Sequence, residues 1–212
     1  MSEQTAEQSE EINTEQAERT TSSKDLARIR RIGSWHISAA FAALAIWGSA
    51  NFWAMNSQLI IAHVTALVLA VAAAKIMGSI IHEWDHFTGA KLSGAIAPVL
   101  AKPRRFYFMF EFDMQNNTSN QFIAMSLGGI LANWLLVVLL LIAIPLNTFA
   151  AAMLVAVATA TAINVSMFEV PIAMAVRAGA DPEETLQTRL REYGLKQYPG
   201  YVAGAFTFLL IT

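Results

Sequence analysis

The sequence predicts an all-α polytopic membrane protein with four transmembrane helices, a C-terminal partial span and a short β element at the cytoplasmic face. Composition is the first indication: 55% of the 212 residues are hydrophobic and 14% are charged, whereas soluble domains carry about 25% charged residues. Length is the second, because a helix needs about 20 apolar residues to cross the hydrocarbon layer. Four stretches meet this requirement: Trp35–Met55, Leu59–Ile81, Phe122–Ile144 and Phe149–Met174.

The distribution of basic residues predicts the orientation. The short connectors 56–58 and 145–148 contain no Lys or Arg, so the spans on either side of each should form antiparallel hairpins. Basic residues gather before the first span, between the second and third, and after the fourth: Lys24, Arg28, Arg30, Arg31, Lys91, Lys102, Arg104, Arg105, Arg177, Arg189, Arg191 and Lys196. Because positive loops tend to stay in the cytoplasm, we expect a bacterial inner-membrane protein with a cytoplasmic N-terminus.

Three regions follow from these patterns. Residues 1–23 hold six Glu, one Arg and no aromatic residue, which predicts a disordered acidic tail. Residues 24–176 form the membrane-embedded core. Residues 177–212 combine a cytoplasmic amphipathic helix, capped by Asp181, with the apolar run Tyr201–Thr212. That run is compatible with a partial span, an interfacial helix or a fifth span cut off by the end of the chain.

Two classes of site are excluded by composition. The chain has no cysteine, so it can form neither disulfides nor thiolate metal sites. It also lacks a basic patch interleaved with aromatic residues, so we expect no nucleic-acid partner. The pattern gives no indication of the oligomeric state.

The segment 82–86 carries the strongest chemical signal, with the sequence His-Glu-Trp-Asp-His at the end of the second apolar stretch. Histidines four apart lie on one face of a helix, where both rings can reach one Zn²⁺ ion. Glu83, between them, is placed to take a proton from water that the metal activates. The pattern also arises by chance, in which case both histidines would be interfacial and Glu83 merely solvated.

A catalytic zinc site needs a third protein ligand in addition to His82 and His86. Glu169 is the preferred candidate, since the fourth span runs back toward the same side of the membrane. Alternatively, Glu169 pairs with Lys75, which lies two turns before His82 on the same helix face. His63 lies about 28 Å away along its own helix, which is too far for a ligand.

The loop after the motif has the character of a strand. Residues 106–114 are rich in aromatic residues and alternate apolar with acidic side chains in their second half, with Pro103 before them as a breaker. An exposed strand could pair with an extended peptide, so Phe108, Phe110 and Phe112 are candidate substrate-binding residues. The equal alternative is an interfacial segment whose aromatic side chains lie among the lipid headgroups.

Three elements in order resemble the site-2 protease family of intramembrane zinc metalloproteases. They are the segment 82–86, the sequence Gly-Gly-Ile-Leu-Ala-Asn at 128–133, which is similar to the family's Gly-Pro-x-x-Asn type of element, and Asn164 on the following span. The strand-like loop also falls where family members carry a substrate-binding β element. The resemblance covers about residues 59–176.

This resemblance implies a role for each matching residue. His82 and His86 would bind Zn²⁺, and Glu83 would activate water. Asn133 would be a polar contributor to catalysis and Asn164 would hold the substrate. The partners it implies are the lipid bilayer and a membrane-protein helix that unwinds locally before cleavage.

The sequence also departs from the family pattern. Asp85 stands where a small residue usually precedes the second histidine. In the family's Asn-x-x-Pro-x-x-x-x-Asp-Gly signature, counted from Asn164, the Pro position is Met167 and the Asp position is Ile172. Glu169 would therefore have to replace the family's aspartate from a shifted position, which predicts a divergent member.

We therefore expect a zinc-dependent intramembrane endopeptidase that cleaves a transmembrane or membrane-proximal segment. One alternative is a catalytically inactive membrane scaffold that keeps the fold, since the third-ligand region is altered. The other is a small transporter that uses Lys75, Glu169 and Asn164 as a polar path.

Overall fold

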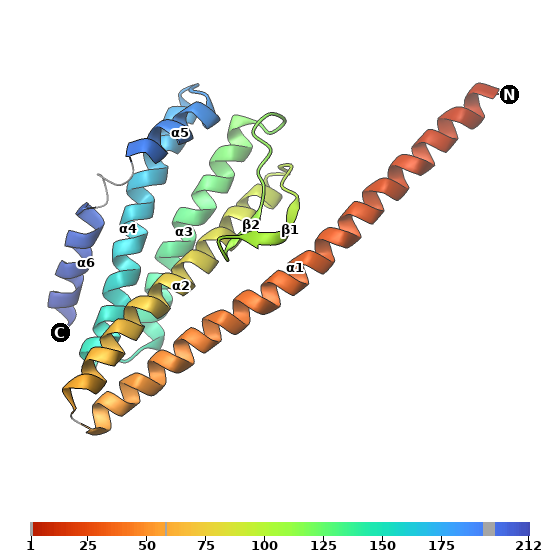
Figure 1. The fold of residues 1–212 in the computed structure, drawn as a ribbon. Coiled ribbons are helices and arrows are strands. Elements are labelled where there is room, and N and C mark those ends of the chain that lie inside the picture. Colours follow the sequence, from red (N-terminus) through yellow and green to blue (C-terminus); the bar gives the residue numbers. More distant parts are fainter. Residues whose placement is uncertain (1, 58, 193–197) are drawn as a thin grey trace.

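The chain folds into a bundle of helices with a two-stranded sheet at one end (Figure 1). This computed structural model describes the backbone of residues 2–57, 59–192 and 198–212, and their side chains from residue 23 onward. The helices are α1 (Ser2–Ser57), α2 (Ile60–Leu92), α3 (Ser119–Ala143), α4 (Phe149–Arg177), α5 (Pro182–Glu192) and α6 (Tyr198–Ile211), and the strands are β1 (Val99–Arg104) and β2 (Phe108–Phe110).

Four helices are long and apolar enough to cross a membrane: Ser23–Ser57 of α1, and all of α2, α3 and α4. The four predicted apolar stretches lie in these helices, apart from Leu59 and Ile144, which cap α2 and α3. The main difference is at α2, which continues to Leu92, so the segment 82–86 lies within an unbroken helix and not at its end. α2 contains no proline, and its two glycines, Gly78 and Gly89, both have helical backbone, so the helix continues through the segment 82–86.

The backbone of the acidic N-terminal segment, for which the composition predicts a disordered tail, is drawn as helix. α1 begins at Ser2, so residues 2–22 continue the first apolar helix. Composition is compatible with a helix, because the segment has no Gly or Pro and contains six Glu and three Gln, which are good helix formers. Side chains before Ser23 lie outside the described residues.

The chain path agrees with the predicted hairpins. Figure 1 shows the α1–α2 and α3–α4 connections at one end of the bundle, and the sheet and α5 at the other. Asp181 caps α5 as predicted, because its Oδ1 accepts the N–H of Glu184 at 2.8 Å. Within the predicted amphipathic helix 181–197, α5 ends at Glu192, and residues 193–197 lie outside the described residues.

Small side chains let the central helices pack closely. The main core joins α2, α3 and α4 through mostly small and branched residues, which leave little space between helix backbones. Its buried members are Trp47, Ala70, Ala73, Ala74, Met77, Leu136, Val137, Leu140, Ala151, Leu154, Val155, Ala158 and Ala162. α1 contributes Trp47 to this core, while Phe41 and Phe52 of the same helix are exposed.

The β element is a hairpin, not the single strand expected over residues 106–114. β2 covers only Phe108–Phe110, and its antiparallel partner β1 includes Pro103, which we had interpreted as a breaker. The chain reverses inside the predicted strand because Arg105 (φ 48°) and Phe106 (φ 77°) adopt left-handed conformations. Pro103 is accommodated because the register between Val99 and Arg104 is irregular.

Polar contacts fix the hairpin against α1. Arg28 donates to the carbonyl oxygen of Val99 at 2.8 Å, and Arg31 donates to that of Ala101. These contacts satisfy carbonyl groups of β1 that β2 does not reach. A strand edge that would otherwise be open is therefore covered.

The loop after the hairpin is fixed by an acidic side chain. The carboxylate of Asp113 accepts hydrogen bonds from the side chain and backbone of Asn116 and from the backbone of Gln115. These hydrogen bonds favour the charged form and lower the pKa of Asp113. The chain then enters α3 through a capping box between Thr118 and Gln121.

The C-terminal apolar run forms α6, which packs on α4 through Gly200 and Gly204. A Cβ at Gly200 would lie 2.2 Å from Asn164 Oδ1, and one at Gly204 would lie 2.7 Å from the Cβ of Ala160. This spacing is the Gly-x-x-x-Gly pattern that allows close helix contact. With 14 residues, α6 is about 21 Å long, less than the roughly 30 Å of a hydrocarbon core.

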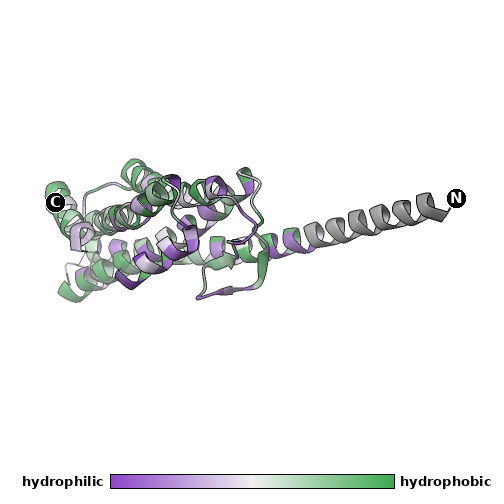
Figure 2. Cartoon of the chain, turned by 90° about the horizontal axis from the view of Figure 1, so that it is seen from above, coloured by the Kyte–Doolittle hydropathy of each residue, from purple (hydrophilic) through white to green (hydrophobic). Residues whose placement is uncertain are grey.

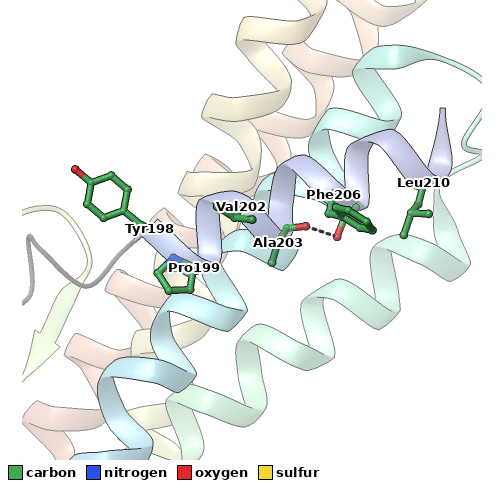
Figure 3. A pocket seen from close by; sticks show the side chains of 7 residues that line it. Tyr198, Pro199, Val202, Ala203, Phe206 and Leu210 are labelled. Carbon is green, nitrogen blue, oxygen red and sulfur yellow. Dashed lines mark hydrogen bonds between the residues drawn. The ribbon is translucent and has the colours of Figure 1, made fainter.

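The opposite face of α6 carries exposed apolar side chains. Figure 3 shows Val202, Phe206 and Leu210 along this face, with Tyr198 and Pro199 at its start. Phe206 and Leu210 are strongly exposed. The described part of the chain thus ends in a short helix with one packed face and one apolar outer face.

We predict that Gly128→Ala destabilises the fold. A Cβ at Gly128 would lie 2.1 Å from the carbonyl oxygen of Asp85, so α2 and α3 would have to separate. Overpacking of this kind costs about 1–3 kcal/mol, measurable as a lower midpoint of thermal unfolding in detergent. Gly48→Ala is the matched control, because nothing lies within 4 Å of its added methyl group. An unchanged midpoint for Gly128→Ala would contradict this packing.

Candidate metal centre

His82, His86 and Glu169 meet at the end of the bundle that carries the hairpin. The Nε2 atoms of the two histidines are 3.0 Å apart. Glu169 Oε1 lies 3.1 Å from Nε2 of His86 and 3.4 Å from Nε2 of His82. Glu169 is 7% exposed, so the three donor atoms converge in a largely enclosed place.

This geometry fits a metal ion. Ligands at 2.0–2.1 Å from a tetrahedral Zn²⁺ lie about 3.3 Å from one another, close to the separations of these three atoms. The three groups form the one set of His, Asp and Glu among the described residues whose ligand atoms lie together closely enough to hold a metal ion. The second carboxylate oxygen of Glu169 is buried without a hydrogen-bond partner, and a bound cation would satisfy it.

Backbone carbonyl groups of α3 hold both imidazole rings. Nδ1 of His86 lies 2.8 Å from the oxygen of Met125, and Nδ1 of His82 lies 3.2 Å from that of Gly129. Since a carbonyl oxygen only accepts, the Met125 contact places the ring proton of His86 on Nδ1. The Nε2 lone pair of His86 is then free to bind a metal ion, the tautomer that metal-binding histidines require. Nδ1 of His82 contacts both the carbonyl oxygen of Gly129 and the amide group of Asn133.

Gly129 is required for this arrangement. An added Cβ would lie 2.5 Å from His86 Cε1 and 2.7 Å from His82 Cε1. Any larger side chain would therefore displace both rings. The Gly-Gly pair at 128–129 serves close helix packing, the structural role expected of small residues, and also makes room for the site.

Asn133 lies one turn after Gly129 on α3 and contacts the same ring. Its Nδ2 is 3.0 Å from His82 Nδ1 and 2.9 Å from the oxygen of Gly129. The side chain is 2% exposed. Predicted as a catalytic residue, Asn133 is placed to orient His82.

Glu83 faces the same region from the next position on α2. It is 4% exposed, and its Oε1 accepts the backbone N–H of Met109 in β2 at 3.2 Å. The carboxylate thus joins α2 to the middle of the short strand. The predicted general base therefore lies between the histidines and the hairpin.

A cavity of about 520 Å³ connects these residues. It reaches from the three donor atoms to the exposed Lys75, two turns before His82 on α2, and is bounded by α2, α3, α4, α5 and the hairpin. Its lining residues are Lys75, Gly78, Ser79, His82, Glu83, His86, Tyr107, Phe108, Phe122, Met125, Ser126, Asn133, Thr161, Val165, Phe168, Glu169, Ile172, Leu186 and Leu190. The cavity has the size of a small-molecule or peptide-binding site.

Of the predicted substrate-binding residues, the structure brings Phe108 alone to this cavity. Phe110 packs on Phe87, with ring centroids 5.5 Å apart, and Phe112 packs on Phe122 at 6.0 Å. β2 ends at Phe110, so the strand alternation we expected does not extend to Phe112.

Asn164 also lies elsewhere. Its side chain is 7% exposed and points toward Gly200 of α6, and its Oδ1 has no hydrogen-bond partner. Five residues separate it from Glu169, which places the two about 140° apart around the helix. The two residues therefore face different neighbours.

The alternative pairing of Glu169 with Lys75 is not formed. The Nζ atom of Lys75 instead lies 3.2 Å from the hydroxyl oxygen of Thr161 on α4. Glu169 contacts the two histidines. Asp85, the unusual residue of the motif, is half-buried, and its backbone carbonyl packs against Gly128.

Sequence reasoning gave no role to His36, which is completely buried. Its Nδ1 accepts the indole N–H of Trp84 at 3.0 Å, and its Nε2 lies 2.9 Å from the carbonyl oxygen of Phe106. Trp84 belongs to the segment 82–86, and Phe106 forms the hairpin turn. His36 thus ties α1 to both parts of the site. Its position at the start of the first span was the sole sequence signal.

Comparison with known proteins gives no assignment: no family model, no curated protein and no solved structure matches the chain. Function is therefore argued from the geometry of the site.

We predict that the purified protein binds about one divalent metal ion per chain, and that His86→Ala loses most of it. The substitution removes one of three ligands and leaves two donors. Metal content after chelation and reloading with Zn²⁺ is the measurement. His63→Ala is the control, because His63 lies on the same helix but outside the cluster. Equal metal content in both variants would exclude this centre.

We also predict that His36→Leu loosens the hairpin without loss of metal. The indole N–H of Trp84 and the carbonyl group of Phe106 would each lose a partner, at about 1–3 kcal/mol for a buried group. Tryptic cleavage at the exposed Arg104 and Arg105 should become several-fold faster. In the control His63→Leu, the rate should equal that of the unsubstituted protein. An unchanged rate in His36→Leu would show that His36 does not hold the turn.

Proposed function

We propose that this protein is a zinc-dependent intramembrane endopeptidase, a divergent member of the site-2 protease family. The observation that carries the proposal is the meeting of His82, His86 and Glu169 in one cavity with the carboxylate of Glu83. A zinc peptidase site consists of two histidine ligands, a third ligand that is acidic, and an adjacent glutamate that acts as the base.

The exposed surface supports a membrane environment. Large apolar side chains are exposed on every long helix, among them Phe41, Ile60, Leu131 and Met174. Figure 2 shows that hydrophobic residues run along the helices of the bundle. Soluble monomers rarely expose so much continuous apolar surface. The bacterial inner membrane, with the hairpin and α5 on the cytoplasmic side, is the location that the basic loops favour.

His82, His86 and Glu169 would hold the metal. Zinc bound in this way polarises a carbonyl group and activates water near neutral pH. Glu83 would accept the proton from the attacking water and donate it to the leaving amine. The carbonyl group of Met125 would keep His86 in the metal-binding tautomer, and Asn133 and the carbonyl group of Gly129 would orient the ring of His82.

The position of Glu169 offers a physical reason for the departure from the family pattern. The family's aspartate position corresponds to Ile172, one helical turn later, and both residues line the cavity. Residues three apart share a helix face, and glutamate is one methylene longer than aspartate. A glutamate one turn earlier can therefore reach the same point.

The substrate we propose is a membrane helix that unwinds locally. A helical segment hides its peptide bonds, whereas an extended one can lie along a strand. Phe108 and Tyr107 line the cavity, and the N–H of Met109 points toward Glu83. An extended substrate segment would lie between the hairpin and the metal ligands.

One observation favours the inactive scaffold as a second candidate. The Glu83 carboxylate bonds to the backbone of Met109, so the hairpin engages the group needed as base. In an active enzyme, the hydrogen bond between Met109 and Glu83 would have to break when substrate binds. The transporter alternative loses one of its three polar residues, because Asn164 does not line the cavity.

We predict that Glu83→Gln lowers cleavage of a transmembrane reporter by about 10²–10⁴-fold, because the amide cannot accept the proton. Zinc content should be unchanged, since Glu83 is not a ligand. Glu111→Gln, at an exposed carboxylate on the hairpin loop, is the control and should leave cleavage intact. Zinc binding without any cleavage by the unsubstituted protein would support the scaffold, and full activity of Glu83→Gln would refute the catalytic assignment.

A further inference from the structure

Lys75 is an ammonium group in the middle of an apolar helix. It lines the same cavity as the metal ligands and Glu83. Its one described contact is with the hydroxyl oxygen of Thr161, at 3.2 Å. Among the described residues no carboxylate lies within ion-pair distance of its Nζ.

The Thr161 contact leaves most of the ammonium group unsatisfied. The hydroxyl of Thr161 donates to the carbonyl oxygen of Val157 at 2.9 Å and accepts from Lys75. An ammonium group has three N–H donors, so two remain for a ligand. An ionisable group within a membrane span is costly, and such groups usually face a cavity and mark a site.

The spacing between Lys75 and the metal ligands fits an extended peptide. Seven residues separate Lys75 from His82, which is about 10 Å along the helix. Gly78 and Ser79 line the cavity between them, so no large side chain of α2 blocks the path. An extended chain rises about 3.3 Å per residue, so 10 Å corresponds to about three residues.

We propose that Lys75 binds a carboxylate of the substrate, located about three residues from the bond that is cleaved. This inference rests on the proposed peptidase function and names a class of substrate for it. The carboxylate belongs either to an Asp or Glu side chain or to the C-terminus of the substrate segment. Both present the same anionic oxygens to the ammonium group, and Lys75 is the one Lys or Arg among the described residues that line the cavity.

Binding can be tested apart from cleavage. The probe is a fluorescent Leu/Ala transmembrane peptide with a central Gly-Pro pair, and the protein is the Glu83→Gln variant in detergent. One peptide series carries a single Glu or Gln two, three or four residues from the centre. A second carries a free or amidated C-terminus at the same distances. We expect about tenfold tighter binding of the acidic member at a spacing of about three residues, and the series in which it occurs identifies the source of the carboxylate.

Substitution of the lysine assigns the effect. In Lys75→Met the preference for the acidic peptide should disappear, and in Lys75→Arg it should persist because the charge remains. Lys91→Met is the matched control: Lys91 lies on the same helix, over the ring of Phe87 and outside the cavity, so the preference should be unchanged. Thermal unfolding of each variant checks that the bundle is intact.

Failure of this inference differs from failure of the proposed function. Equal binding of acidic and neutral peptides by the Glu83→Gln protein, or absence of binding by both, overturns the role of Lys75 whether or not the unsubstituted protein cleaves the reporter. A preference that survives Lys75→Met overturns it as well. A preference that depends on Lys75, in a protein that cleaves nothing, would support the carboxylate site and refute the peptidase.

Discussion

The close approach of α3 to α2 is the constraint on which the site depends. Three glycines make it possible, since a Cβ at Gly89, Gly128 or Gly129 would lie within 2.5 Å of atoms of the other helix. Only at this separation can the carbonyl groups of Met125 and Gly129 reach the two imidazole rings. The orientation of the two rings therefore depends on backbone carbonyl groups of α3 as well as on the side chains themselves.

Polar contacts concentrate at the hairpin end of an otherwise apolar bundle. Arg28 and His36 hold the hairpin from α1, and Glu83 holds it from α2. Each contact satisfies a backbone group that would otherwise lack a partner away from water. The same contacts fix the distance between the strand and the cluster of His82, His86 and Glu169. α1 therefore acts as a brace for the site, although it supplies none of the three ligand atoms.

Some errors of sequence interpretation have clear physical causes. The single strand expected over 106–114 is a hairpin because two residues other than glycine adopt positive φ angles, which sequence pattern does not signal. Asn164 lies on the expected helix but faces α6, because the direction of a side chain depends on how α4 is rotated against its neighbours. The contact of α6 with α4 was missed even though its Gly-x-x-x-Gly spacing was present at Gly200 and Gly204.

The sequence by itself determined the four apolar helices, their antiparallel order and the histidine pair on one face of the second helix. These properties are local: they depend on the length of apolar stretches and on the 3.6-residue turn. Only the tertiary structure decided that Glu169 joins His82 and His86, that Phe108 alone of three phenylalanines reaches the cavity, and that Lys75 lacks a carboxylate partner. These three features depend on how helices far apart in the chain are rotated and how closely they approach. The packing of small residues sets both.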